Sequence, residues 1–201
     1  MEDLRLPYTR AFRCFQKIET ERLLIRRVYM SDAQDMYDYS RDENVAQHVL
    51  WHAHKSLRQS KEYIQFLQYK YSRGAAASYG IILRQSGKLI GTIGFMELRP
   101  DNASADIGYS LHKDYWNQGL MTEALQAMLH YGFMELGLNR IEAVHEVDNP
   151  SSGRVLEKAG MQYEGIVRNK FYNKGRFVDV KQYAILFDDF MRRCRSEENN
   201  V

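Results

Sequence analysis

The feature that most constrains this chain is an apolar strand that runs through a short polar turn directly into a helix. The run Ala105–Leu111 predicts the strand, and the helix begins at Gln118-Gly119. The first N–H groups of a helix have no partner inside it, and the peptide dipoles place partial positive charge there. Gly119 has no Cβ, so the backbone can approach a ligand closely, and Thr122 adds a hydroxyl one turn later. A phosphate group held in this turn would satisfy these donors.

The spacing of the turn does not by itself distinguish an anion site from an ordinary turn glycine. Two common phosphate-binding motifs are absent from the chain, which has neither a GxxxxGK[ST] loop nor a GxGxxG fingerprint. Both interpretations of Gly119 therefore stay open at this point.

Length and charge exclude several classes of protein. A chain of 201 residues is expected to form one domain with a substantial core. Its 28 Lys and Arg against 26 Asp and Glu leave a net charge of +2, which argues against a nucleic-acid groove or a polybasic membrane patch. The apolar runs are far shorter than the roughly 20 residues that span a bilayer, and we expect no leader segment. Cys14 and Cys194 lie in no CxxC or Cys/His motif, so we expect reduced thiols and a cytoplasmic protein.

Hydrophobic periodicity and turn residues predict seven strands and four helices in the order βααβββαβαββ. A strand–helix–strand crossover within a mostly antiparallel set implies a mixed sheet, and so an α/β (α+β) fold. We expect the domain to span 18–190, after an extension at 1–17 and before a polar tail at 191–201. The predicted strands are 20–28, 79–84, 88–97, 104–111, 139–147, 162–171 and 176–187, and the predicted helices are 31–40, 56–74, 119–136 and 150–158.

Two stretches allow more than one interpretation. Residues 1–17 mix basic and apolar side chains, which suits either an amphipathic segment packed on the domain or a loosely ordered arm. The stretch around His48, His52 and His54 has two histidines two positions apart but no third ligand nearby. We interpret it as a surface loop over a substrate cleft and predict no metal.

Six segments, taken together and in order, resemble the GNAT superfamily of acetyl-CoA-dependent N-acetyltransferases. The likeness is greatest to the RimJ/RimL-like branch, which includes enzymes that acetylate the N-termini of ribosomal proteins. It covers about 18–190 and implies a mixed, mostly antiparallel sheet of about seven strands with about four helices, in which the strands 105–111 and 139–147 splay apart. The segments are IETERLLIR at 18–26, GTIGF at 91–95, ADIGYSL at 105–111, YWNQGLMTEAL at 115–125, DNPSSGRVLEKAGM at 148–161 and YNKGRFVDV at 172–180.

The resemblance places the pyrophosphate loop of the family on 116–121, with Trp116 and Met121 departing from its usual Gln/Arg and Gly/Ala. Main-chain N–H groups do the binding, so the departures are tolerable if the Met121 side chain points away from the phosphates. A donor at Leu111 or His112 would serve as the oxyanion hole. The implied binding groups for the cofactor are the amides of Asn117, Gln118, Gly119, Leu120, Met121 and Thr122 and the backbone of Tyr109, Ser110, Leu111 and His112.

The second half of the implied site is the helix that follows Asp148. Asn149 matches the family asparagine that bonds the pantetheine or orients the intermediate. Many members carry a tyrosine general acid where this chain has Leu156, so Ser152 is our candidate to donate to the departing sulfur, or else a residue that only bonds its own backbone. Arg154 and Lys158 would reach the 3′-phosphate, or else are solvated surface charges.

The implied reaction is direct attack of a neutral amine on the acetyl thioester. No general base is evident, and the candidates are Asp106, Glu146 and Asp148. An α-amino group (pKa ~7.7–8.0) is easier to deprotonate than lysine (~10.4) by about 3.5 kcal/mol, so a missing base favours a protein N-terminal amine. The alternatives are a small-amine acetyltransferase, a regulator that binds acyl-CoA without turnover, and an unrelated nucleotide binder. We expect 42–56 and 162–180 to shape the acceptor pocket, and a homo-oligomer stays open.

Overall fold

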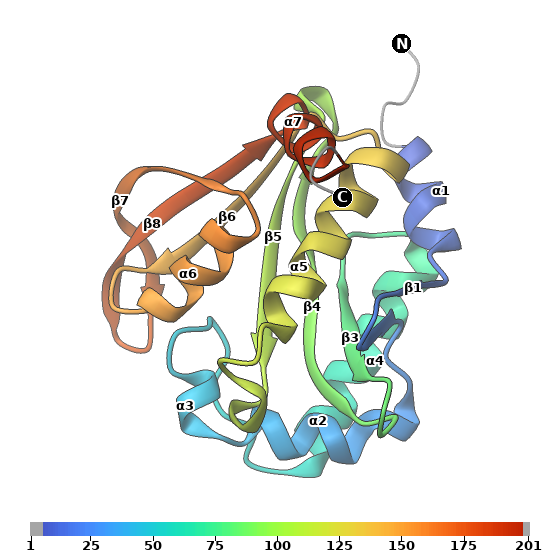
Figure 1. Ribbon diagram of the computed structural model, residues 1–201. Helices are drawn as coiled ribbons and strands as arrows, with labels where there is room; N and C mark the ends of the chain where they lie inside the picture. The colour runs from blue at the N-terminus through green and yellow to red at the C-terminus, as the bar shows by residue number, and fades with distance from the viewer. Residues whose placement is uncertain (1–5, 199–201) are drawn as a thin grey trace.

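One eight-stranded mixed sheet forms the centre of the molecule, in the order β1-β2-β3-β4-β5-β6-β8-β7 (Figure 1). The computed structural model describes residues 6–198. All neighbouring strands are antiparallel except β5 and β6, which confirms the predicted mixed sheet. The strands are β1 (Lys17–Glu19), β2 (Leu23–Arg26), β3 (Ser78–Leu83), β4 (Leu89–Arg99), β5 (Ser104–Leu111), β6 (Arg140–Glu146), β7 (Gln162–Asn173) and β8 (Arg176–Leu186).

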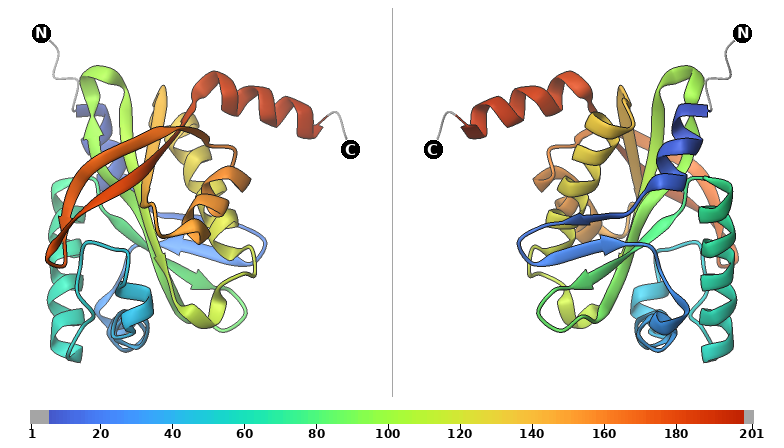
Figure 2. Two further views of the ribbon diagram at one scale, coloured as in Figure 1. Left: turned by 90° about the vertical axis from the view of Figure 1, so that its left-hand side faces the viewer. Right: turned by 90° about the vertical axis from the view of Figure 1, so that its right-hand side faces the viewer.

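Helices cover both faces of this sheet. Figure 2 shows α5 and α6 on one face and α1, α2 and α4 on the other. Because both faces are covered, β3 and residues 89–95 of β4 are nearly continuous buried runs rather than alternating ones. The α-helices are α1 (Leu6–Cys14), α2 (Ala33–Ser40), α3 (Glu43–Ala46), α4 (Leu57–Arg73), α5 (Leu120–His130), α6 (Pro150–Lys158) and α7 (Phe187–Glu198).

The central strands β5 and β6 pair over only three positions and then diverge. Their parallel ladder runs from Ser104↔Arg140 to Asp106↔Glu142. Beyond it, β5 stays paired with β4 as far as Leu111, and β6 stays paired with β8 as far as Glu146. The expected splay of the central strands is therefore present, and it leaves one edge of each strand unpaired.

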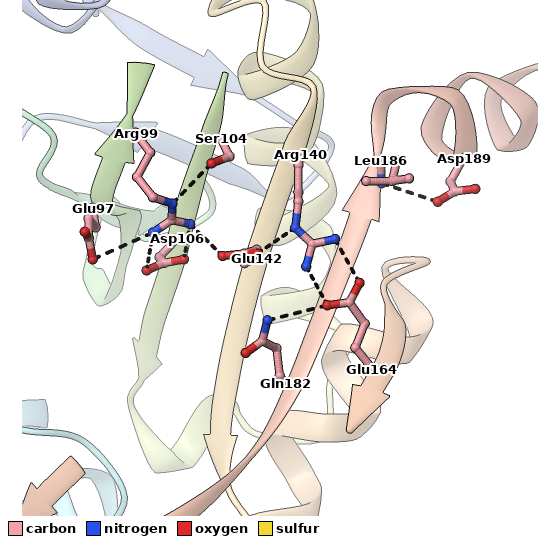
Figure 3. A network of polar contacts seen from close by, with 10 residues as sticks. All are labelled: Glu97, Arg99, Ser104, Asp106, Arg140, Glu142, Glu164, Gln182, Leu186 and Asp189. Atoms are coloured by element: carbon pink, nitrogen blue, oxygen red, sulfur yellow. Dashed lines mark hydrogen bonds and ion pairs between the residues drawn. The ribbon is translucent and has the colours of Figure 1, made fainter. Parts of the chain in front are cut away.

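A network of ion pairs crosses the sheet at the end where β5 and β6 are still joined (Figure 3). Arg99 on β4 contacts Asp106 on β5 at 2.8 Å and Glu142 on β6 at 2.5 Å. Arg140 contacts Glu142 at 2.6 Å and extends the network to Glu164 on β7. The network therefore joins the two halves of the sheet directly beside the point of divergence.

The structure adds elements at both ends of the chain that the periodicity did not predict. Helix α1 occupies most of the predicted extension and buries Phe12, while Phe15 follows it and stacks on Tyr79 with 3.8 Å between ring centroids. Helix α7 covers most of the predicted polar tail and is held by Phe190, which packs against Phe133. Residues 1–5 and 199–201 lie outside the described part of the chain.

The predicted helix 119–136 changes character near its end. It is α-helical from Leu120 to His130 and continues as a π-helical turn over Tyr131–Glu135 before Gly137 ends it in the left-handed region. No helix within residues 6–198 is long and apolar enough to cross a membrane.

Candidate active site

A cleft of about 590 Å³ occupies the open end of the β5–β6 splay. Its walls come from the end of β5, the turn before α5 and the start of that helix, α6, and α3 with the segment that follows it. Of the residues assigned from the sequence, His112 and Gln118 do not line it. Those that do are Tyr109, Ser110, Leu111, Asn117, Gly119, Leu120, Met121, Thr122, Asn149, Ser152, Arg154 and Lys158.

The turn between β5 and α5 has the backbone geometry of an anion site. Asn117 (φ 59°) and Gly119 (φ 77°) are both left-handed, and no side chain caps the first turn of α5. The N–H groups that open this helix therefore have no partner inside it and lie at the wall of the cleft. Trp116, one of the two departures, donates its indole N–H to the carbonyl of Leu111 at 2.8 Å. Met121, the other, is buried in the core.

The support beneath this turn was not predicted from the sequence. Arg22 donates to the carbonyl of Gln118 at 2.9 Å and to the carboxylate of Glu123 at 2.7 Å. Thr20 donates to the same carboxylate at 2.6 Å. Burial raises the pKa of Glu123, but these hydrogen bonds and the Arg22 charge outweigh it, so the net pKa is lowered. The β1–β2 turn thus holds the start of α5 through an ionised carboxylate.

Strand pairing decides which backbone groups of β5 face the gap. The amide of His112 donates to Ile90 at 2.7 Å, so it is not available to a ligand. Because antiparallel ladders alternate, the backbone of Ser110 faces β4, whereas Tyr109 and Leu111 turn their N–H groups toward the splay. Leu111 is therefore the better placed of the two oxyanion-hole candidates.

Ser152 lies in a hydroxyl pair with Tyr109. The two hydroxyl oxygens are 2.9 Å apart, and the Tyr109 hydroxyl also donates to the Ser152 carbonyl at 3.2 Å. Burial raises the pKa of Tyr109, so the phenol stays protonated. Asn149 accepts from the Ser152 amide at 3.3 Å and caps α6. Leu156, where the family tyrosine would stand, is fully buried in the core.

The side chain of Tyr109 was not predicted, although strand alternation offered a signal. Ala105, Ile107, Tyr109 and Leu111 share one face of β5, so Tyr109 projects toward the helices on that face rather than toward solvent. Its neighbour in space, α6, could not be identified from β5 alone.

The three candidate bases have different surroundings. Asp106 is bound to Arg99 in the network at the closed end of the splay. Asp148 lines the cleft, but its side chain is 69% exposed and 3.7 Å from Arg176. Glu146 is buried and does not line the cleft; it contacts His48, which does. From the sequence, His48 is predicted to lie in a surface loop over a substrate cleft, with no catalytic role.

The segment 42–50 bridges the two diverging halves of the sheet. On one side, Asp42 pairs with Lys113 after β5 at 2.6 Å, which holds the pKa of Asp42 at about 2. On the other, Lys174 at the β7–β8 turn donates to the carbonyls of Ala46 and Val49 at 2.8 and 2.5 Å. Figure 1 shows α3 between the tip of that hairpin and the turn after β5. For residues 42–50, the first part of the predicted segment 42–56, this arrangement supports the predicted role in shaping the cleft.

Two basic residues on α6 complete the cleft wall. Arg154 and Lys158 both line it, and Arg154 contacts the hydroxyl of Ser151 at 3.1 Å.

Within residues 6–198, no three His, Cys, Asp or Glu side chains gather in a way that could hold a metal ion.

Comparison with known proteins identifies the family. The acetyltransferase (GNAT) domain matches residues 22–162, which is more than half of the chain. The chain is a member of the GNAT acetyltransferase family. It is therefore an acetyltransferase, and acetyl-CoA is its acetyl donor.

Named relatives place the chain in the RimJ/RimL-like branch. It is 33% identical over 171 residues to the uncharacterized N-acetyltransferase p20 of Bacillus licheniformis, covering 85% of this chain and 96% of the relative. It is 31% identical over 143 residues to the ribosomal-protein-serine acetyltransferase of Escherichia coli (strain K12), covering 66% and 80%. A solved RimL, a ribosomal L7/L12 alpha-N-protein acetyltransferase in complex with coenzyme A, has the same fold, with a TM-score of 0.77, 24% identity and coverage of 87% and 99%.

Proposed function

We propose that this GNAT enzyme acetylates the N-terminal amine of a protein. The observation that carries the proposal is the 31% identity to a ribosomal-protein-serine acetyltransferase over most of that relative's length. The chemistry of the cleft agrees with it. None of the three candidate carboxylates is free, because each contacts a cationic or hydrogen-bonding side chain. An α-amino group is already partly neutral at pH 7, so it needs less help from a base than lysine does.

The acetyl donor fits the residues at the open splay. We assign the pyrophosphate to the amides from Asn117 to Thr122, where the left-handed turn and the free helix start supply donors. We assign the pantetheine arm to the unpaired backbone edge of β5, at Tyr109 and Leu111. Arg154 and Lys158 are the proposed partners of the 3′-phosphate. Acetyl-CoA supplies an activated acyl group with a thiolate leaving group.

The residues beside the reacting carbonyl have separate proposed roles. The Leu111 N–H stabilises the negative charge that develops on the carbonyl oxygen, an interaction typically worth ~2.7–4 kcal/mol. Ser152, hydrogen-bonded to Tyr109, donates to the departing sulfur. The Oδ1 atom of Asn149 caps α6, so its amide nitrogen is the part of that side chain left to contact the donor or acceptor.

Coenzyme A release with three acceptors tests this function. The first is a lysine-free peptide with a free N-terminal serine, the second is the same peptide with a blocked N-terminus and one internal lysine, and the third is spermidine. We expect the first to be turned over at least tenfold faster than the second at pH 7. Equal turnover of the two peptides contradicts an N-terminal acceptor. Preference for spermidine indicates a small-amine enzyme, and binding of acetyl-CoA without cleavage indicates a regulator.

A further inference from the structure

We propose that His48 is the general base of this enzyme and that Glu146 positions it. The inference rests on the proposed function, because it requires an amine acceptor that loses a proton. It adds a catalytic residue that lies outside the family segments quoted above.

The half-buried His48 and the buried Glu146 form a pair at the edge of the cleft. The Nδ1 atom of His48 lies 3.0 Å from Oε2 of Glu146, with the histidine side chain 19% exposed and the carboxylate side chain 6% exposed. His48 comes from the segment after α3 and Glu146 from the end of β6, 98 positions apart. His48 lines the cleft together with Tyr109, Leu111 and Ser152, the residues assigned to the acetyl group and the leaving sulfur.

The partners of Glu146 fix the orientation of the imidazole. Asn173 donates to Oε1 at 2.6 Å, and Arg176 donates to Oε2 at 3.2 Å. Burial raises the pKa of Glu146, but the hydrogen bonds from His48 and Asn173 and the nearby positive charge outweigh it, so the carboxylate is ionised. An ionised carboxylate only accepts hydrogen bonds, and therefore the proton of a neutral His48 is on Nδ1. Its Nε2 carries the lone pair, and no hydrogen bond to this atom occurs within the described residues.

The backbone around His48 is held from the opposite half of the sheet. Lys174 and Asn173 both donate to the carbonyl of Val49, one residue after His48. Because this segment also pairs with Lys113 through Asp42, it cannot shift without breaking contacts on both sides of the cleft. A base fixed in this way meets the geometric requirement for proton transfer better than a residue on an untethered loop.

The charged and titratable groups around the pair come from four elements. Arg176 on β8 and Lys174 at the β7–β8 turn are the nearby cations. Burial lowers the pKa of Lys174, and the negative charges of Glu146 and of Glu43 on α3 act in the opposite direction. His145, on β6, is buried with its pKa lowered first by burial, so it is the neutral neighbour of the pair. These groups leave Glu146 as the negative charge in direct contact with the His48 ring.

The proposed step balances without any further reactant. The amine nitrogen forms a bond to the carbonyl carbon of the acetyl thioester, and one of its protons passes to Nε2 of His48. The carbon–sulfur bond breaks and its electron pair leaves with sulfur as a thiolate, which accepts a hydrogen bond from the Tyr109–Ser152 hydroxyl pair. His48 then gives its proton to water and the thiolate takes one from water, so an amide and coenzyme A are the only products.

The first test compares His48→Gln with His52→Gln. His52 is an exposed histidine of the same loop, so it controls for the substitution itself. With the serine peptide at pH 7, we expect H48Q to lower kcat/KM by about 10²–10⁴-fold and H52Q to leave it unchanged. We expect acetyl-CoA binding, measured by calorimetry, to stay within about twofold in both variants. A wild-type rate in H48Q overturns the proposal.

The pH profile distinguishes a base from a structural residue. We expect the wild-type rate to fall on the acid side of its profile, because only a neutral imidazole accepts a proton, and the H48Q rate to rise with pH until the amine itself is deprotonated. Added imidazole should restore part of the activity of His48→Gly. If the profile of H48Q parallels that of the wild type, or if imidazole has no effect on a folded H48G, the base assignment is wrong.

Glu146 needs a different readout because it acts through His48. In Glu146→Gln we expect kcat to fall about tenfold while the KM for acetyl-CoA stays within about twofold, because the imidazole loses the carboxylate that fixes its orientation. An unchanged kcat in a folded E146Q contradicts the positioning role. If the wild-type enzyme cleaves acetyl-CoA with no amine at all, the proposed function fails rather than this inference.

Discussion

At the scale of single residues, most of the proposed chemistry depends on the left-handed turn at Asn117 and Gly119 and on the Tyr109–Ser152 hydroxyl pair. Gly119 has φ 77°, and a Cβ added there would lie 3.5 Å from Arg22, an ordinary van der Waals distance. The backbone conformation, rather than a lack of space, therefore restricts this position to glycine. Gly137 is also left-handed, at φ 65°, but lies away from the cleft with open space around it. Substituting each glycine in turn therefore distinguishes the cost of backbone strain, which both positions share, from the effect on ligand binding, which only Gly119 should show.

We predict that Gly119→Ala destabilises the protein by about 1–2 kcal/mol and raises the Kd for acetyl-CoA about tenfold or more. The first effect comes from forcing a Cβ into the left-handed region, and the second from moving the amides of the α5 start. Gly137→Ala should show a similar stability loss with unchanged Kd. Thermal unfolding and calorimetry measure both quantities. Equal affinity in the two variants would contradict the assignment of the pyrophosphate site.

Removing either member of the hydroxyl pair should slow the chemical step. We expect Tyr109→Phe and Ser152→Ala each to lower kcat by about tenfold, because each removes one hydrogen bond of a shared donor system. The double variant should lose less than the product of the two single losses, since neighbours in one network are not additive. Single-turnover kinetics give the rate. Fully multiplicative losses would show that the two hydroxyls act separately.

At the scale of elements, the cofactor turn depends on a strand turn far from it in sequence. Arg22 and Thr20 hold Glu123, and Arg22 also holds the Gln118 carbonyl, so the start of α5 is positioned from the edge of the sheet. Figure 2 shows β1 and β2 beside α5. These contacts form only when the β1–β2 turn and the start of α5 come together in the folded protein.

We predict that Arg22→Gln raises KM for acetyl-CoA about three- to tenfold with little change in kcat. The substitution removes a donor to the turn but leaves the residues at the reacting carbonyl in place. Arg84→Gln is a matched control, because Arg84 contacts the same β1–β2 turn through backbone carbonyls without touching α5. A wild-type KM in R22Q would show that the turn is rigid without this support.

At the scale of the whole molecule, ionised carboxylates join segments that are distant in sequence. Glu146 joins β6 to the β7–β8 hairpin and to His48, Glu123 joins α5 to the β1–β2 turn, and Glu164 joins β7 to Arg140 on β6. The pKa of each is lowered, for Glu164 first by the Arg140 hydrogen bond and for the other two despite burial. Segments that are distant in sequence are therefore held together by groups that acid neutralises.

We predict that stability falls as the pH drops from about 5 to 3. A carboxyl whose pKa is lower in the folded state stabilises the protein above its unfolded pKa of about 4.3, and this contribution is lost as the pH falls through the folded value. Glu164→Gln should be less stable than wild type at pH 7, by about 0.5–1 kcal/mol because the pair is partly exposed, and should lose less on acidification. Urea unfolding at each pH measures this. A stability that is flat between pH 7 and pH 3 contradicts the prediction.

The local pattern of the chain determined the elements near the site and the order in which they occur. Period-two runs, turn glycines and the Pro150 helix start predicted β5, α5, β6 and α6 within a few residues, because these signals are local. The additional helix at each end escaped prediction because Phe12 and Phe190 are buried by distant partners, and a short amphipathic stretch has no fixed face until it packs.

Only the tertiary structure decided which side chains meet at the cleft. Tyr109 meets Ser152 across 43 positions and His48 meets Glu146 across 98, and no spacing rule connects such pairs. Strand pairing also decided that the Leu111 amide, rather than that of His112, faces the gap. The physical reason is that local sequence sets backbone conformation, whereas register and the divergence of β5 from β6 set the distances between residues that the chain keeps far apart.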